Sequence, residues 1–178
     1  MNKMDEIVRQ IKNQTEINFI NIRDQIEVAE LEAVFDGVNG SRYIFHNLHS
    51  MDRFFINPMS YVYEGEKLFD IPENLSVIST AREGYVADTS IVISREKLLE
   101  YFEYVKNKIE KYLDQLTAEE LLQKPEGCEY PRLELILGQF RHQMWHVGLS
   151  SAITFENKKV WNKFSGMNAL NQKFFGGK

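Results

Sequence analysis

The sequence is poor in several features that mark particular classes of protein. Its one cysteine, Cys128, allows no intramolecular disulfide, which suits a reducing compartment. No apolar run approaches the ~20 residues that span a bilayer, and no apolar segment follows the polar N-terminus as in a secretion signal. The formal net charge of -5 provides no basic field for a nucleic-acid backbone. We therefore expect a cytoplasmic protein that binds neither nucleic acid nor a membrane.

The composition is that of a globular protein with an ordinary core. Of the 178 residues, 43% are hydrophobic and 26% are charged, which is usual for a soluble domain. This length is enough to bury a core and corresponds to one domain of typical size. We expect a single domain over residues 1–178.

Apolar residues recur every three or four positions through most of the chain, which is the helical period. The pattern predicts long helices over 4–35, 41–56, 94–116 and 131–157, the first with a bend or restart at the polar residues 13–16. Ser41 and Ser94 are predicted N-caps, Pro131 suits the first helical position, and Thr117 to Glu120 forms a capping box. The fold class predicted is all-α, a four-helix bundle.

Two segments lie outside the four predicted helices. Residues 57–93 hold two of the four prolines and should form a long crossover between the second and third helices, with a short strand or helical turn. The crossover is either a lid over a site or a simple return of the chain. The C-terminal extension, 158–178, is too apolar for a free tail, with Trp161, Phe164, Phe174 and Phe175 among its aromatic residues. It should pack on the bundle or on a second subunit, so we expect a homodimer.

The four histidines form two pairs, each with helical spacing. His142 and His146 are four residues apart, and His46 and His49 are three apart, so each pair shares one face of a helix. Two imidazoles one turn apart are a common way for a helix to bind a metal ion. Two such pairs on separate predicted helices therefore predict a metal site, whereas one pair alone would be weak evidence.

Three alternative sites do not fit the residues around the histidines. A zincin protease has Glu directly after its first histidine, where this chain has Gln143. A ferritin-like di-iron site needs Glu three residues before a histidine, and here Gln139 precedes His142 at that spacing. The glycine-rich turn of a dinucleotide-binding fold is absent. A mononuclear site remains, made by His142, His146 and either His46 or His49.

Three imidazole ligands would leave at least one coordination position for water or substrate, as in reactive rather than structural sites. Such an ion could ionise a bound water or thiol. The alternative is that the histidines are core residues bonded to backbone carbonyls. Cys128 stands in a predicted loop, and we assign it no role.

Three short motifs, in this order and spacing, resemble those of the DinB/YfiT-like superfamily. They are FHNLHSMD at residues 45–52, LTAEEL at 116–121 and RHQMWHVG at 141–148, and the resemblance covers roughly residues 1–157. It implies an up-down-down-up four-helix bundle, frequent homodimers and a divalent metal bound by three histidines. The family pattern places these ligands at His46, His142 and His146, whereas His49 matches a variable position.

The resemblance implies a class of chemistry but no single reaction. Similar proteins are described as metal-dependent hydrolases and as transferases that use a low-molecular-weight thiol. We therefore expect a metal-dependent enzyme whose zinc, nickel, iron or manganese ion activates a thiol or water against a small-molecule substrate. The alternative is a non-catalytic metal-binding or stress-response dimer, because no carboxylate is securely placed beside the histidines as a general base.

Overall fold

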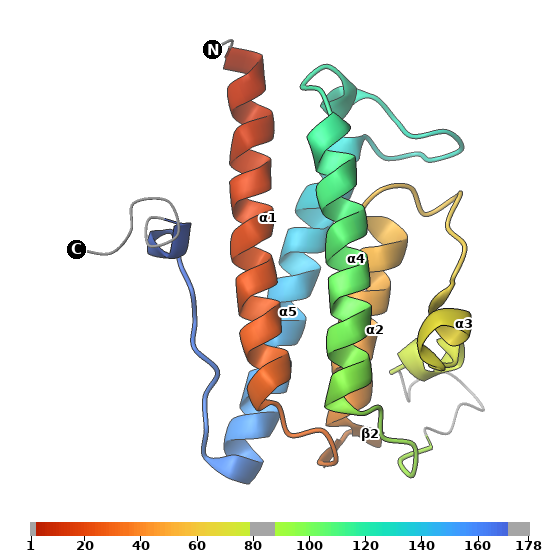
Figure 1. Cartoon of the computed structure of the whole chain (residues 1–178), viewed down its shortest axis with the longest axis vertical. Helices are drawn as coiled ribbons and strands as arrows, with labels where there is room; N and C mark the ends of the chain where they lie inside the picture. Colours follow the sequence, from red (N-terminus) through yellow and green to blue (C-terminus); the bar gives the residue numbers. More distant parts are fainter. Residues whose placement is uncertain (1–2, 79–87, 171–178) are drawn as a thin grey trace.

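The chain is mostly helical (Figure 1). The computed structural model describes residues 3–78 and 88–170. The long helices are α1 (Lys3–Val28), α2 (Gly40–Phe54), α4 (Arg95–Gln115) and α5 (Arg132–Lys158). The shorter elements are β1 (Val34–Phe35), β2 (Val38–Asn39), α3 (Gly65–Phe69) and the 3-10 helices η1 (Glu73–Ser76) and η2 (Glu120–Leu122). No helix in this part of the chain combines the length and apolar character needed to cross a membrane.

The four long helices lie side by side around one apolar core. Helices α1 and α2 each contact α4 and α5, and in Figure 1 α1 and α5 run downward while α2 and α4 run upward. Large side chains from every long helix are buried between them, including Ile22, Phe45, Phe102 and Ile136. Full burial of such a side chain is worth about 1.5–3 kcal/mol, so the core holds the helix faces that carry the histidines in place.

Helix α1 differs from its prediction at both the bend and the end. It is continuous through residues 13–16, where the buried Thr15 hydroxyl donates to the Ile11 carbonyl at 2.8 Å and so needs no break in the helix. It ends at Val28 rather than at residue 35, because β1 and β2 form a small antiparallel hairpin there. Asp36 and Gly37 both have positive φ, as a two-residue hairpin turn requires. The predicted all-α class therefore needs this small sheet added.

Helix α2 begins one residue earlier than predicted. Its N-cap is Asn39, whose side chain accepts from the Arg42 amide, and not Ser41. The Ser41 hydroxyl instead donates to Asn39 and accepts from the Ile93 amide, which joins the start of α2 to the segment before α4. Gly40 is required because a Cβ there would collide with the Glu30 carbonyl. The helix ends at Phe54, two residues before the predicted end.

The caps of α4 and α5 lie within one residue of their predictions, and the predicted capping box lies at the start of η2. Ser94 caps α4 through its side chain, as predicted. Thr117 and Glu120 form the predicted reciprocal capping box, with Glu120 accepting from Thr117 and donating its amide to the Thr117 hydroxyl. Pro131 is the N-cap of α5 rather than its first helical residue.

The crossover is described over 57–78 and 88–93, and the rest of it lies outside the described residues. The predicted helical turn is present as α3 and η1. Beyond α5, residues 159–170 run back along the helices (Figure 1). The buried Asn21 side chain donates through Nδ2 to the Ser165 backbone carbonyl, and its Oδ1 accepts from the Ser165 backbone N–H, both at 2.8 Å. This part of the tail packs on the long helices, as predicted, whereas Phe174 and Phe175 lie outside the described residues.

Candidate metal centre

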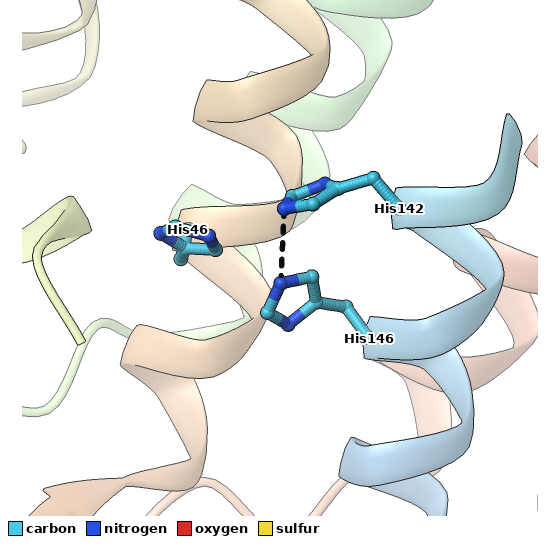
Figure 2. A group of neighbouring side chains, drawn as sticks. All are labelled: His46, His142 and His146. Atoms are coloured by element: carbon cyan, nitrogen blue, oxygen red, sulfur yellow. Dashed lines mark hydrogen bonds between the residues drawn. The ribbon is translucent and has the colours of Figure 1, made fainter. Parts of the chain in front are cut away.

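Three of the four histidines meet between α2 and α5. His46 projects from α2, and His142 and His146 project from successive turns of α5 toward it (Figure 2). The ring of His46 lies 5.3 Å from that of His142 and 4.7 Å from that of His146, between ring centres. One nitrogen from each ring lies within 4.8 Å of the others, so the group could hold a metal ion. The fold thus brings together residues that are 96 positions apart in the sequence.

The two α5 histidines already have the separation that a shared ion needs. Their Nε2 atoms are 3.1 Å apart. Two nitrogens each ~2.0–2.1 Å from a tetrahedral zinc ion would be about 3.3 Å apart. The same separation suits an N–H···N hydrogen bond between two neutral rings, which is the ordinary alternative for a buried pair.

Burial keeps the three imidazoles uncharged at neutral pH. Desolvation, with a smaller effect of the neighbouring rings, lowers the pKa of His142 to about 4 and that of His146 to about 3. Desolvation also lowers the pKa of His46, against the opposing effect of its backbone hydrogen bond. Because a metal binds the unprotonated imidazole, these rings present lone pairs to a cation without first losing a proton.

Among the described residues, only His46 of the three has a hydrogen-bond partner for its Nδ1 atom. Its Nδ1 lies 2.7 Å from the carbonyl oxygen of Ser76 in η1. Because a carbonyl can only accept, Nδ1 carries the hydrogen and Nε2 has the free lone pair. The Nδ1 atoms of His142 and His146 are buried, and no partner for them occurs among the described residues. The crossover therefore contributes directly to the centre.

His49, the rival third ligand, lies outside the cluster. Its Nε2 is 2.9 Å from a carboxylate oxygen of Glu73 in η1, and its ring packs against those of Tyr61 and Tyr63. The His49 side chain is buried, and a buried imidazole needs a hydrogen-bond partner. The Glu73 carboxylate is that partner. The structure places His46, not His49, with the α5 pair.

A second buried polar cluster lies one turn beyond His49 and was not foreseen. The Asp52 carboxylate accepts from Lys108 Nζ at 2.7 Å and from the hydroxyls of Tyr61 and Tyr101 at 3.0 Å. Burial and the Asp52 charge raise the pKa of both tyrosines. The Lys108 side chain is 34% exposed, and its ammonium group reaches inward to this carboxylate. The residues are too far apart in sequence for any local pattern to indicate the cluster.

The remaining residues singled out from the sequence take no part in the cluster. Cys128 is buried in the loop before α5 and belongs to no metal-ligating group of the described residues. Neither glycine of α5 marks a close helix contact: a Cβ at Gly138 would meet only the end of the Arg141 side chain at 3.9 Å, and one at Gly148 would meet nothing within 4 Å. Gly148 lines a groove of about 550 Å³ between α1, α5 and the C-terminal segment.

Comparison of the chain with protein-family models, with curated proteins and with solved structures found no match.

Proposed function

We propose that this protein binds one divalent metal ion through His46, His142 and His146. In this proposal α1, α2, α4 and α5 form the up-down-down-up bundle of a DinB-like protein, and the ion serves a metal-dependent reaction on a small molecule. The observation that carries the proposal is the convergence of three uncharged imidazoles from two helices. A buried group of three nitrogen lone pairs repels itself less when a cation lies between them.

The candidate ions are zinc, nickel, iron and manganese, because imidazole accepts most of them. Three protein ligands leave room at the ion for water or a thiol, and a bound ion lowers the pKa of either. The resemblance of the motifs points to a thiol S-transferase or a hydrolase. The Ser76 carbonyl orients the His46 ring. The spacing of one helical turn brings the Nε2 atoms of His142 and His146 together.

The experiment is elemental analysis of the purified protein and of four single histidine-to-alanine variants. We expect about one divalent ion per chain in the wild-type protein, and loss of that ion in His46→Ala, His142→Ala and His146→Ala. His49→Ala is the matched control, since His49 is a buried histidine of the same helix but is paired with Glu73. A wild-type protein that contains no metal and takes up neither Zn²⁺ nor Ni²⁺ would refute the proposal.

A second candidate is a non-catalytic metal-binding dimer. It is favoured by the make-up of the ligand group, which contains no carboxylate within the described part of the chain and so offers no adjacent general base. Assays of the zinc- and nickel-loaded protein with a low-molecular-weight thiol and an electrophile, and with ester and amide panels, separate the two. Turnover that disappears in His142→Ala would favour the enzyme, and retained metal without turnover would favour the second candidate.

We further propose that the protein acts in the cytoplasm as a homodimer. The C-terminal segment supports the dimer, because Trp161, Phe164 and Met167 are exposed although the backbone between them is docked on α1. An exposed group of large apolar side chains often marks a protein–protein contact. Sedimentation equilibrium should report a mass twice that of the 20.9 kDa chain for the wild-type protein. For Phe164→Glu it should report the mass of a single chain.

A further inference from the structure

Arg42 is a fully buried arginine one helical turn before His46. Its exposed fraction is 1%, and it is among the largest side chains in the interior. Arginine is rarely buried to this extent unless its donors are satisfied. Because residues at i and i+4 share a helix face, Arg42 and His46 meet the same neighbouring segment.

That segment is the end of η1, and Arg42 binds it through backbone carbonyls. Arg42 Nε donates to the Leu75 carbonyl at 3.1 Å, and Nη2 donates to the Val77 carbonyl at 2.7 Å. Nη1 donates to the Asp88 carbonyl at 3.3 Å, so the same side chain also binds the far part of the crossover. The rigid fork of a guanidinium suits this task, since it reaches several acceptors in fixed directions.

Between the two carbonyls that Arg42 binds lies the carbonyl that His46 binds. The Ser76 carbonyl accepts from His46 Nδ1 at 2.7 Å. Three successive carbonyls, of residues 75, 76 and 77, therefore bind two side chains of one face of α2. Holding the two outer carbonyls limits the φ and ψ rotations by which the middle one could turn away, because the peptide planes themselves are rigid.

We propose that Arg42 is a positioning residue for the metal ligand His46. By holding the Leu75 and Val77 carbonyls, it places the Ser76 carbonyl where that oxygen keeps the hydrogen on His46 Nδ1. His46 Nε2 is thereby left unprotonated and directed toward the α5 pair. This inference rests on the proposed function, and it makes the end of the crossover a part of the site rather than only a lid or a return.

The test compares Arg42→Lys with Arg95→Lys. Arg95 is the matched control, because its guanidinium also donates to two backbone carbonyls, those of Ile26 and Ala29, at the end of α1. Lysine keeps the charge but cannot reproduce the fork. Zinc affinity is measured by competition with a chromophoric chelator, and the visible spectrum of the Co²⁺-loaded protein reports the ligand field.

We expect Arg42→Lys to weaken zinc binding by about 10–100-fold, the usual effect of losing a group that orients a ligand, and to change the cobalt spectrum. Arg95→Lys should leave the zinc affinity and the cobalt spectrum unchanged, even if it lowers the melting temperature as much as Arg42→Lys does. Zinc affinity of Arg42→Lys within about twofold of wild type, or an equal loss in Arg95→Lys, would overturn the inference. Failure of the wild type to bind metal refutes the proposed function instead, because it precedes any comparison of variants.

A second readout needs no metal, and its wild-type measurement needs no well-folded variant. Nitrogen-15 NMR of the wild-type imidazoles distinguishes the two neutral tautomers, and His46 should carry its hydrogen on Nδ1. In Arg42→Lys the His46 signals should shift toward a mixture of tautomers, whereas in Arg95→Lys they should not. A wild-type His46 that carries its hydrogen on Nε2 would overturn the inference even if Arg42→Lys did not fold.

Discussion

The two histidines on the α5 side of the cluster are brought together by helix spacing, whereas the histidine on its α2 side is oriented by a contact from the crossover. His142 and His146 are brought together by their spacing, and their Nδ1 atoms have no partner among the described residues. His46 is oriented by the Ser76 carbonyl, 30 positions further along the chain. A local period thus supplies two candidate ligands, and a long-range hydrogen bond orients the third candidate.

The largest expected effect comes from breaking the α5 side. His142→Ala or His146→Ala should abolish stoichiometric zinc binding, a larger loss than the 10–100-fold typical of orienting groups, because each removes a nitrogen itself. Isothermal titration with Zn²⁺ measures this effect. Zinc affinity within tenfold of wild type in either variant would mean that the helix pair is not the centre of the site.

The comparison of His46 with His49 tests the selection made on the α2 side. His46→Ala should weaken zinc binding by at least 10–100-fold, whereas His49→Ala should change it by a few-fold at most. The reason is that the His49 imidazole is hydrogen-bonded to the Glu73 carboxylate and lies outside the histidine cluster. Competition titrations give both affinities. Equal and complete loss in the two variants would indicate a four-histidine site.

A substitution at Asp52 tests whether the whole crossover or only its end supports His46, because Asp52 binds Tyr61 of the crossover. Asp52→Asn should lower the free energy of unfolding by about 2–3 kcal/mol, because the carboxylate is buried and accepts from Lys108, Tyr61 and Tyr101. Urea denaturation measures this loss. Zinc affinity should stay within about twofold of wild type, since the contact at Ser76 remains. A tenfold drop would show that the whole crossover acts as one unit.

The smallest expected effect is on the pH dependence of stability without metal. Burial lowers the pKa of His142 to about 4 and that of His146 to about 3, below the ordinary value of ~6.5 in the unfolded chain. Between these values the unfolded state binds more protons, so the free energy of unfolding falls as pH falls through this window. From pH 7 to 5 we expect a loss of about 1–2 kcal/mol, reduced by partial solvent exposure.

The matched protein for the pH experiment is the double variant His142→Gln/His146→Gln, which has no titrating group at either position. Its free energy of unfolding should change less between pH 7 and 5, as urea denaturation at each pH would report. An identical pH dependence in the two proteins would contradict the view that the α5 pair is buried in the uncharged form. Below pH 5 carboxylates also titrate, so the comparison is confined to this window.

Local sequence patterns predicted most of the helices but not all of their ends. The caps at Ser94 and at Thr117 with Glu120 were correct, because capping joins groups only three residues apart. The predicted end of α1 was wrong by seven residues, because a hairpin that turns at Asp36 and Gly37 follows the helix. Two strands of two residues are too short to show an alternating period, and the hairpin forms against the rest of the fold.

By itself the sequence determined the long helices and the pairing of His142 with His146, because both follow from the 3.6-residue period. Only the tertiary structure decided that His46 joins this pair while His49 binds Glu73, since both lie on one face of α2 and no local rule separates them. It also decided that the buried Asp52 pairs with Lys108, whose side chain is partly exposed. The physical reason is the same in both cases. A hydrogen bond between distant segments depends on how the connecting segments place them in space, and helical periodicity does not determine that placement.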